Sequence, residues 1–264
     1  MTTSTPREWD ATAYHHLAQP QYEWAVRRLS SLDLTGDETV LDAGCGSGRV
    51  TERLLERLPR GRVIALDASR NMIEAAREYL TPAFADRVRF IHSDLLTFEL
   101  DTSVDAVFST AVFHWVLDHD RLFRRLHDVL RPGGRLHAQC GGGANVLRIR
   151  ERCAEILSRE PYAEHFARWR EPWLFEGPEG AAVRLRAAGF VNVKTHLEGV
   201  TPVLPDAPTY RAFLASVVCA SYVEVLPPEL GERYLDAMTA AGENDSPPWS
   251  LDYVRLNLSA TRPG

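Results

Sequence analysis

The stretch best suited to chemistry is the glycine-rich run VLDAGCGSG at residues 40–48. It follows a short apolar segment and precedes a pattern of helical period, which together predict a tight turn between a strand and a helix. Glycines let a backbone turn sharply and let a ligand come close, while the N-terminus of the next helix offers free N–H groups. This combination is typical of a site for a nucleotide-containing cofactor.

The turn departs from the dinucleotide fingerprint GxGxxG. Gly44 and Gly46 fit that pattern, but Arg49 occupies its third glycine position and the additional glycine is Gly48. Asp42 lies inside the turn, where its charge would repel a pyrophosphate and attract the ammonium group of a ligand with an amino acid end. These residues therefore favour such a ligand over NAD.

Residues 40–48 resemble motif I of the class I S-adenosylmethionine (SAM) methyltransferases at every position. Asp67 follows about 20 residues later, where an acid of that family holds the ribose hydroxyls. Asp94, in the run HSDLL, matches the position that reads the adenine amino group, together with a neighbour such as Leu95. The run RPGG at 131–134 is also similar to the family pattern.

The resemblance implies a fold and a cofactor. The fold is a Rossmann-like α/β domain with a seven-stranded, mostly parallel sheet, helices on both faces and helical cap insertions. The cofactor is SAM, with S-adenosylhomocysteine as product, and a metal is not expected. The cofactor-binding residues that it implies are Asp42, Gly44, Cys45, Gly46, Asp67, Ala68, Met72, Ser93, Asp94, Leu95 and Thr110.

The stretch STAVFHWVLDHDRLFRRL at 109–126 should border the methyl acceptor, because the end of the fourth strand faces the sulfonium in this family. It lacks the proline-rich motif of DNA and protein N-methyltransferases, and we interpret SPPW at 246–249 as a coincidence of composition. FHW followed by VxDxxRxF resembles the group that contains the juvenile hormone acid and trans-aconitate methyltransferases, which esterify small carboxylic acids. That resemblance implies substrate-binding roles for Tyr14, Gln21 and Trp115.

The chemistry of methyl transfer helps to choose between the possible methyl acceptors. A carboxylate has a pKa near 4 and needs no base, so the enzyme mainly positions the reactants, which supplies about 7–11 kcal/mol. Gln21 and Trp115 are neutral donors suited to orienting a carboxylate. A phenol, carbon or amine acceptor would instead want a general base, for which His114 is the candidate. His114 and Trp115 as simple packing residues, and a protein that binds SAM without turnover, remain alternatives.

Strands that alternate with helices must position these residues, which implies βαβ units and a parallel sheet covered on both faces. Ser69 is the predicted N-cap of the third helix. In the first half, strands are expected at 38–44, 62–67, 88–94, 103–110 and 135–140, and helices at 22–32, 49–58, 69–82 and 120–130.

The second half is less regular. Helical stretches at 144–189 and 207–242 are interrupted by prolines, 191–197 alternates like a strand, and 252–261 is predicted as an edge strand. Within one domain we distinguish N-terminal lid helices at 1–35, a SAM-binding core at 36–143, a helical insertion at 144–190, and the last two strands with a second insertion at 191–264.

Composition bounds the possible partners. Hydrophobic residues at 45% and charged residues at 25% are globular values, and a net charge of −6 argues against a nucleic-acid partner. With no membrane-spanning run or secretory leader, we expect a cytoplasmic monomer or homodimer that acts on a small molecule. Aromatic residues at 166–175 either wall a pocket or pack the insertion, and the arginines at 148–170 are predicted to be mostly solvated, with one available to a second acid of the substrate.

Overall fold

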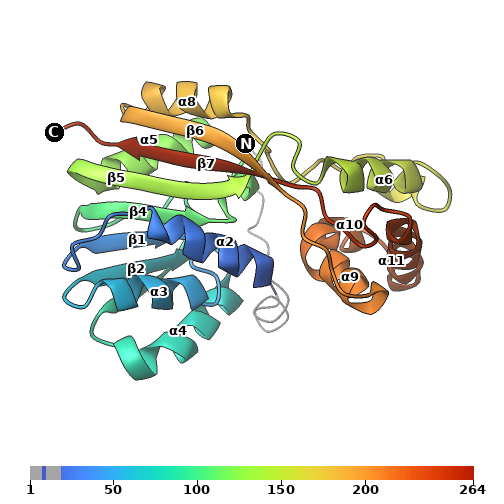
Figure 1. Ribbon diagram of the computed structural model, residues 1–264, viewed down its shortest axis with the longest axis horizontal. Helices are drawn as coiled ribbons and strands as arrows, with labels where there is room; N and C mark the ends of the chain where they lie inside the picture. Colours follow the sequence, from blue (N-terminus) through green and yellow to red (C-terminus); the bar gives the residue numbers. More distant parts are fainter. Residues whose placement is uncertain (1–7, 10–18) are drawn as a thin grey trace.

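A seven-stranded sheet organises the chain in the computed structural model, which describes residues 8–9 and 19–264 (Figure 1). The strand order is β3-β2-β1-β4-β5-β7-β6. The first five strands pair in parallel, whereas β7 is antiparallel to both of its neighbours. The predicted fold class is therefore confirmed. The strands are β1 Thr39–Ala43, β2 Arg62–Asp67, β3 Val88–His92, β4 Val104–Thr110, β5 Leu130–Gly141, β6 Val191–Val200 and β7 Tyr253–Thr261.

Helices cover both faces of the sheet, as Figure 1 shows. On one face lie α2 (Gln19–Ser30), α3 (Arg49–Arg57) and α4 (Arg70–Phe84), and on the other lie α5 (His119–Val129) and α8 (Pro178–Ala187). Each helix turns an apolar stripe toward the strands, as expected from its period. Buried leucines of α2 and α3 form one core cluster, and those of α5 and α8 form another.

The remaining helices form a cap lobe beyond the carboxyl ends of the parallel strands (Figure 1). The lobe has its own apolar cluster, in which Tyr210, Phe213 and Tyr234 are fully buried. These segments are the expected insertions, with short η2 and α10 elements before the predicted break at Pro227. The cap helices are α6 Leu147–Leu157, α7 Ala163–Phe166, α9 Ala207–Phe213, the π-helical η2 Leu214–Val218, α10 Ala220–Val223 and α11 Pro228–Glu243.

The helix α4 shows how local signals set its ends. Ser69 is its N-cap, as predicted, and its Oγ accepts a hydrogen bond from the Met72 N–H. The helix passes Pro82 and ends at Phe84. Pro82 lies in the exposed last turn, where a missing N–H costs one hydrogen bond and does not break the helix.

The prediction that residues 252–261 form an edge strand is wrong. β7 lies between β5 and β6, so Leu258 pairs with Ala138 on one side and Thr195 on the other. The alternation that suggested an edge has a different cause. On one face β7 buries leucines, and on the face toward α2 it buries polar side chains, since Arg255 and Asn257 are each only 3% exposed.

Neither a membrane span nor a metal cluster is found in the part of the chain that the structure describes. No helix of residues 8–9 and 19–264 has both the length and the hydropathy needed to cross a bilayer. Within the same residues, histidine, cysteine, aspartate and glutamate side chains form no group of three that would hold a metal ion.

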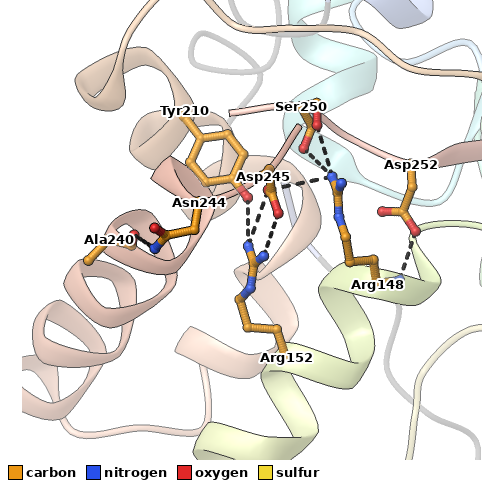
Figure 2. Close-up of polar contacts among 8 residues, drawn as sticks. All are labelled: Arg148, Arg152, Tyr210, Ala240, Asn244, Asp245, Ser250 and Asp252. Carbon is orange, nitrogen blue, oxygen red and sulfur yellow. Dashed lines mark hydrogen bonds and ion pairs between the residues drawn. The ribbon is translucent and has the colours of Figure 1, made fainter. Parts of the chain in front are cut away.

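A buried ionic network fixes α6 against the end of α11 (Figure 2). Asp245 has a side chain only 4% exposed, and its Oδ1 accepts a hydrogen bond of 2.6 Å from Arg152. Arg148 lies 3.5 Å from the same carboxylate and donates to the Ser250 carbonyl. The expected solvated helix face is therefore wrong for Arg148 and Arg152.

We predict that Asp245→Asn lowers the free energy of unfolding by ~3 kcal/mol, because the amide keeps the shape but leaves two partly buried guanidiniums without a counter-charge. Urea denaturation measures the change. Glu155→Gln on α6, the helix of Arg148 and Arg152, is the matched control. The ion pair of Glu155 with Arg159 is exposed and should contribute no more than ~0.5 kcal/mol. Equal losses in the two variants would contradict this account of the network.

Candidate active site

The glycine turn after β1 is held by the neighbouring strand and by the loop after β4. The N–H groups of Gly44 and Cys45 both donate to the Leu66 carbonyl, at 2.8 and 2.9 Å. Gly44 has a φ of 88°, and a Cβ there would lie 2.1 Å from Val112 Cγ2. Gly46, with a φ of 54°, has open space where a Cβ would stand. The turn is thus packed on one side and leaves room for a ligand on the other.

Asp67 ends β2 and turns back toward the glycine turn. Its Oδ2 accepts a hydrogen bond from the Gly46 N–H and its Oδ1 accepts one from the Ser69 N–H, both at 2.9 Å. Burial raises the pKa of Asp67, although these hydrogen bonds favour its charged form. The carboxylate is fixed at the edge where a cofactor would lie.

Asp42 lies beneath the turn and is only 2% exposed. Its Oδ2 accepts a hydrogen bond of 2.7 Å from the Thr51 hydroxyl of α3. Desolvation raises the pKa of Asp42 to about 7, and the nearby charge of Asp67 adds to the effect. A cation next to this carboxylate would restore its ordinary, lower pKa.

The other predicted cofactor residues lie along the same edge of the sheet, on the turns after β2, β3 and β4. Asp94 follows β3, and its Oδ1 accepts a hydrogen bond of 2.6 Å from the Leu96 N–H. The Ser93 N–H donates to the Asp67 carbonyl, which ties the third turn to the second. Ala68 precedes the N-cap of α4, buried Met72 lies in the first turn of that helix, Leu95 is buried, and Thr110 ends β4. The structure therefore brings the described sequence candidates together.

Two residues near the N-terminus cover this edge. Glu8 accepts hydrogen bonds from the Ser69 hydroxyl at 2.8 Å and from the Arg70 N–H at 3.2 Å. The Trp9 ring packs edge-to-face on Trp115, with centroids 5.4 Å apart. Glu8 was not predicted, because no local signal links it to a helix about 60 residues away.

Tyr14, predicted to bind the substrate, lies outside the described residues. Of the predicted lid at 1–35, the structure describes residues 8–9 and the segment from 19 onward, whereas residues 1–7 and 10–18 lie outside the description.

A pocket opens between the carboxyl ends of the strands and the cap lobe. Four predicted residues line it, namely Gln21, Thr110, His114 and Trp115. After β4 the backbone bends toward the pocket at Ala111, whose φ of 61° is unusual for a residue with a side chain. This bend after β4 starts the short helix η1 (Phe113–Trp115), which carries His114 and Trp115 into the wall.

His114 is held as a neutral ring. Its Nδ1 accepts a hydrogen bond of 3.2 Å from the Gly141 N–H, so the proton of the neutral imidazole lies on Nε2. Desolvation, with a smaller effect of His119, lowers the pKa of His114 to about 3. A ring in this state donates a hydrogen bond and is a poor proton acceptor at neutral pH.

Trp115 lies beside His114 on the same short helix, with ring centroids 5.0 Å apart, and Gln21 also lines the pocket. The Gln21 Nε2 donates to the Tyr253 hydroxyl at 3.2 Å, while its buried Oε1 has no partner among the residues that the structure describes. Trp115 packs edge-to-face on Trp173, with centroids 6.0 Å apart. Tyr253 was not predicted, because it lies far away in the sequence on β7.

The charged side chains of the pocket wall, among the described residues, are two arginines, and no aspartate or glutamate lines it. Arg150 donates from Nη2 to both carboxylate oxygens of Glu171, at 2.9 Å. Arg255 lies 3.0 Å from Glu198, and its guanidinium stacks on Trp24 at 4.1 Å. Arg150 was among the arginines expected to be mostly solvated, and Arg255 was not singled out.

Comparison with known proteins points to the same class of enzyme as the glycine turn after β1. Residues 40–134 match the model of a methyltransferase domain. The chain is 33% identical over 246 residues to the trans-aconitate 2-methyltransferase of Acidovorax ebreus (strain TPSY), covering 88% of both chains. Its counterpart from Acidovorax sp. (strain JS42) is 26% identical over 246 residues, also with 88% of both chains covered.

The chain belongs to the trans-aconitate methyltransferase family of class I methyltransferases. It is a SAM-dependent methyltransferase. Its fold is shared with Haemonchus contortus phosphoethanolamine N-methyltransferase 2, solved with S-adenosyl-L-methionine, at a TM-score of 0.64 and 17% identity over 96% of this chain and 57% of that one. The open face at Gly46 and the carboxylates beside it fit this cofactor, with its ammonium and ribose hydroxyls.

We predict that S-adenosylhomocysteine binds about tenfold more weakly at pH 6 than at pH 8, because the Asp42 carboxyl is protonated below its free pKa and must lose that proton to face the ligand ammonium. Calorimetry across this pH range measures the dissociation constant. In Asp42→Asn, which cannot titrate, the profile should be flat. An unchanged pH dependence in this variant would contradict the role of Asp42.

Proposed function

We propose that this enzyme transfers the methyl group of SAM to a carboxylate oxygen of a small organic acid. The observation that carries the proposal is a pocket with no carboxylate in its described wall and with a histidine that is not basic at neutral pH. An acceptor in such a pocket must arrive already ionised. The relatives named trans-aconitate 2-methyltransferase support this, because trans-aconitate is a carboxylic acid.

The reaction needs no proton transfer. Bound SAM supplies a methyl group that its positive sulfur has already activated. A carboxylate oxygen attacks the methyl carbon in line, the C–S bond breaks with its electron pair moving to sulfur, and a methyl ester and S-adenosylhomocysteine result. What remains for the protein is to orient the two reactants and to exclude water.

Neutral donors at the strand end of the pocket are suited to orient the carboxylate. His114 presents an Nε2–H because its Nδ1 is occupied by Gly141, and Trp115 carries an indole N–H. Neutral donors hold the anion without withdrawing as much charge as a cation would. The Gln21 amide, predicted for this role, is joined to Tyr253. We therefore assign it to the wall behind the donors.

The cofactor assignments follow the family pattern on matching residues. We assign Asp67 to the ribose hydroxyls, Asp42 with the turn from Gly44 to Gly46 to the amino acid end, and Asp94 with Leu95 to the adenine. The geometry supports these roles, because the carboxyl ends of β1, β2 and β3 lie side by side. Trp9 and Trp115, packed together, are placed to keep water from the transferring methyl group.

The His114→Asn variant separates this proposal from the alternative in which His114 is a base. The asparagine Oδ1 can replace Nδ1 as acceptor for the Gly141 N–H, so the wall is kept. We predict a loss in kcat of no more than about tenfold, where loss of a general base would cost about 10²–10⁴-fold. With an acid acceptor, kcat should also be flat from pH 6 to 8. A rate that rises through a pKa, and loses this dependence in the variant, would favour a phenol or amine acceptor.

A chemical test of the product addresses the proposal itself. Enzyme incubated with methyl-labelled SAM and a panel of organic acids should yield a labelled product that releases methanol in mild alkali, as methyl esters do and methyl ethers or amines do not. Asp67→Ala should abolish labelling. If no acid in the panel is labelled by the wild-type enzyme, the proposal is wrong.

A further inference from the structure

The pocket has two ends with different chemistry. The strand end carries the polar groups of His114, Gln139 and the backbone at Gly141. The cap end is walled by apolar side chains from η2 and α10. The segment between α7 and α8 joins the two ends, because Phe175 packs on His114 with ring centroids 5.6 Å apart. Any acceptor whose carboxylate is held at the strand end must therefore extend the rest of its structure toward the cap.

Aromatic rings form a continuous wall at the cap end. Trp173 is stacked on Phe175, with an interplanar angle of 22° and centroids 6.0 Å apart. It also packs edge-to-face on Tyr222, at 5.6 Å. Such mutually packed rings are fixed in place and offer large apolar surfaces to a ligand.

The π-helical segment η2 contributes the rest of this apolar wall. Its wide turn is marked by the Cys219 N–H, which donates to the Leu214 carbonyl at 2.7 Å. Val217 and Val218 lie in this turn and line the pocket. A π-turn adds a residue to the helix and changes which side chains face a site, and it is frequent at functional sites. Here it places two branched apolar side chains in the wall.

Each cation of the wall already faces a carboxylate of the protein. Arg150 is held by both oxygens of Glu171, and Arg255 is paired with Glu198 and covered by Trp24. Arg255 pairs in register with Gly141, and its guanidinium nitrogens have no hydrogen-bond partner among the described residues, so it can accommodate one ligand carboxylate at the strand end. A second carboxylate at the cap end would be desolvated among aromatic rings, and the described wall offers it no cation that is not already paired, which is strongly unfavourable.

We infer that the acceptor is a monocarboxylic acid with a bulky apolar body, aromatic or branched, which lies against Trp173, Tyr222 and Val218 while its carboxylate lies beside His114. This inference rests on the proposed O-methylation of an acid. The acceptor so inferred differs from trans-aconitate, for which the relatives are named, because trans-aconitate has three carboxyl groups and no bulky apolar part.

A matched pair of acids tests the inference. 2-Benzylsuccinate contains the skeleton of 3-phenylpropanoate with one added carboxymethyl group, so the two differ chiefly in the second charge. We expect kcat/KM for 3-phenylpropanoate to exceed that for 2-benzylsuccinate and that for trans-aconitate by at least about tenfold. A preference for the diacid or the triacid would overturn the inference while leaving acid O-methylation standing. If no acid is methylated, the proposed function fails and the inference fails with it.

A steric variant tests the cap end separately. Val218→Phe fills the space expected for the apolar body, so kcat/KM for 3-phenylpropanoate should fall by about tenfold or more, whereas that for butanoate should fall less than about threefold. Val183→Phe on α8, where the valine is 63% exposed, is the control and should leave both values unchanged. Calorimetry with S-adenosylhomocysteine checks that each variant is folded. Equal effects on both acids in Val218→Phe, or no effect on either, would contradict the placement.

Discussion

The close packing of Gly44 against Val112 is the constraint on which the rest of the site depends. A side chain at position 44 would collide with Val112, so only glycine lets the turn after β1 approach the loop after β4. The first of these segments follows Asp42 of β1 and donates a hydrogen bond to Asp67, and the second leads directly into His114 and Trp115. One close contact thus brings the methyl donor and the acceptor to the same edge of the sheet.

Burial then decides the charge state of the groups at this edge. The carboxylates under the turn have raised pKa values and gain from a cationic ligand, whereas His114 in the pocket is kept neutral by desolvation and by its bond to Gly141. A site of this kind is suited to a reaction between a positive donor and a negative acceptor, in which no proton moves. The cap helix α6 is anchored to Asp245 through Arg148 and Arg152 (Figure 2). Arg150, two residues from each of them and so on the opposite face of the helix, lines the pocket.

The sequence analysis predicted the parts of the site whose signals are local. Residues 40–48 and Asp67 lie at the carboxyl ends of strands with clear apolar patterns, and Ser69 was recognised as a cap from its own helix. Tyr253, Arg255 and Glu8 were missed, because their partners lie about 60 to 230 residues away and nothing near them in the chain marks the contact. The strand β7 was assigned to an edge because its polar side chains face the buried surface under α2, which a single sequence reads as solvent.

The central claim is that the acceptor reacts as an anion without a base, and proton release measures this most directly. A carboxylate and SAM give an ester with no proton set free, whereas a phenol or an ammonium acceptor sets free one proton for each methyl group transferred. The enzyme would be supplied with labelled SAM and a mixture of acids, phenols and amines in weakly buffered solution near pH 7. The account predicts methyl transfer with no accompanying proton release. One proton released for each methyl group transferred would contradict it.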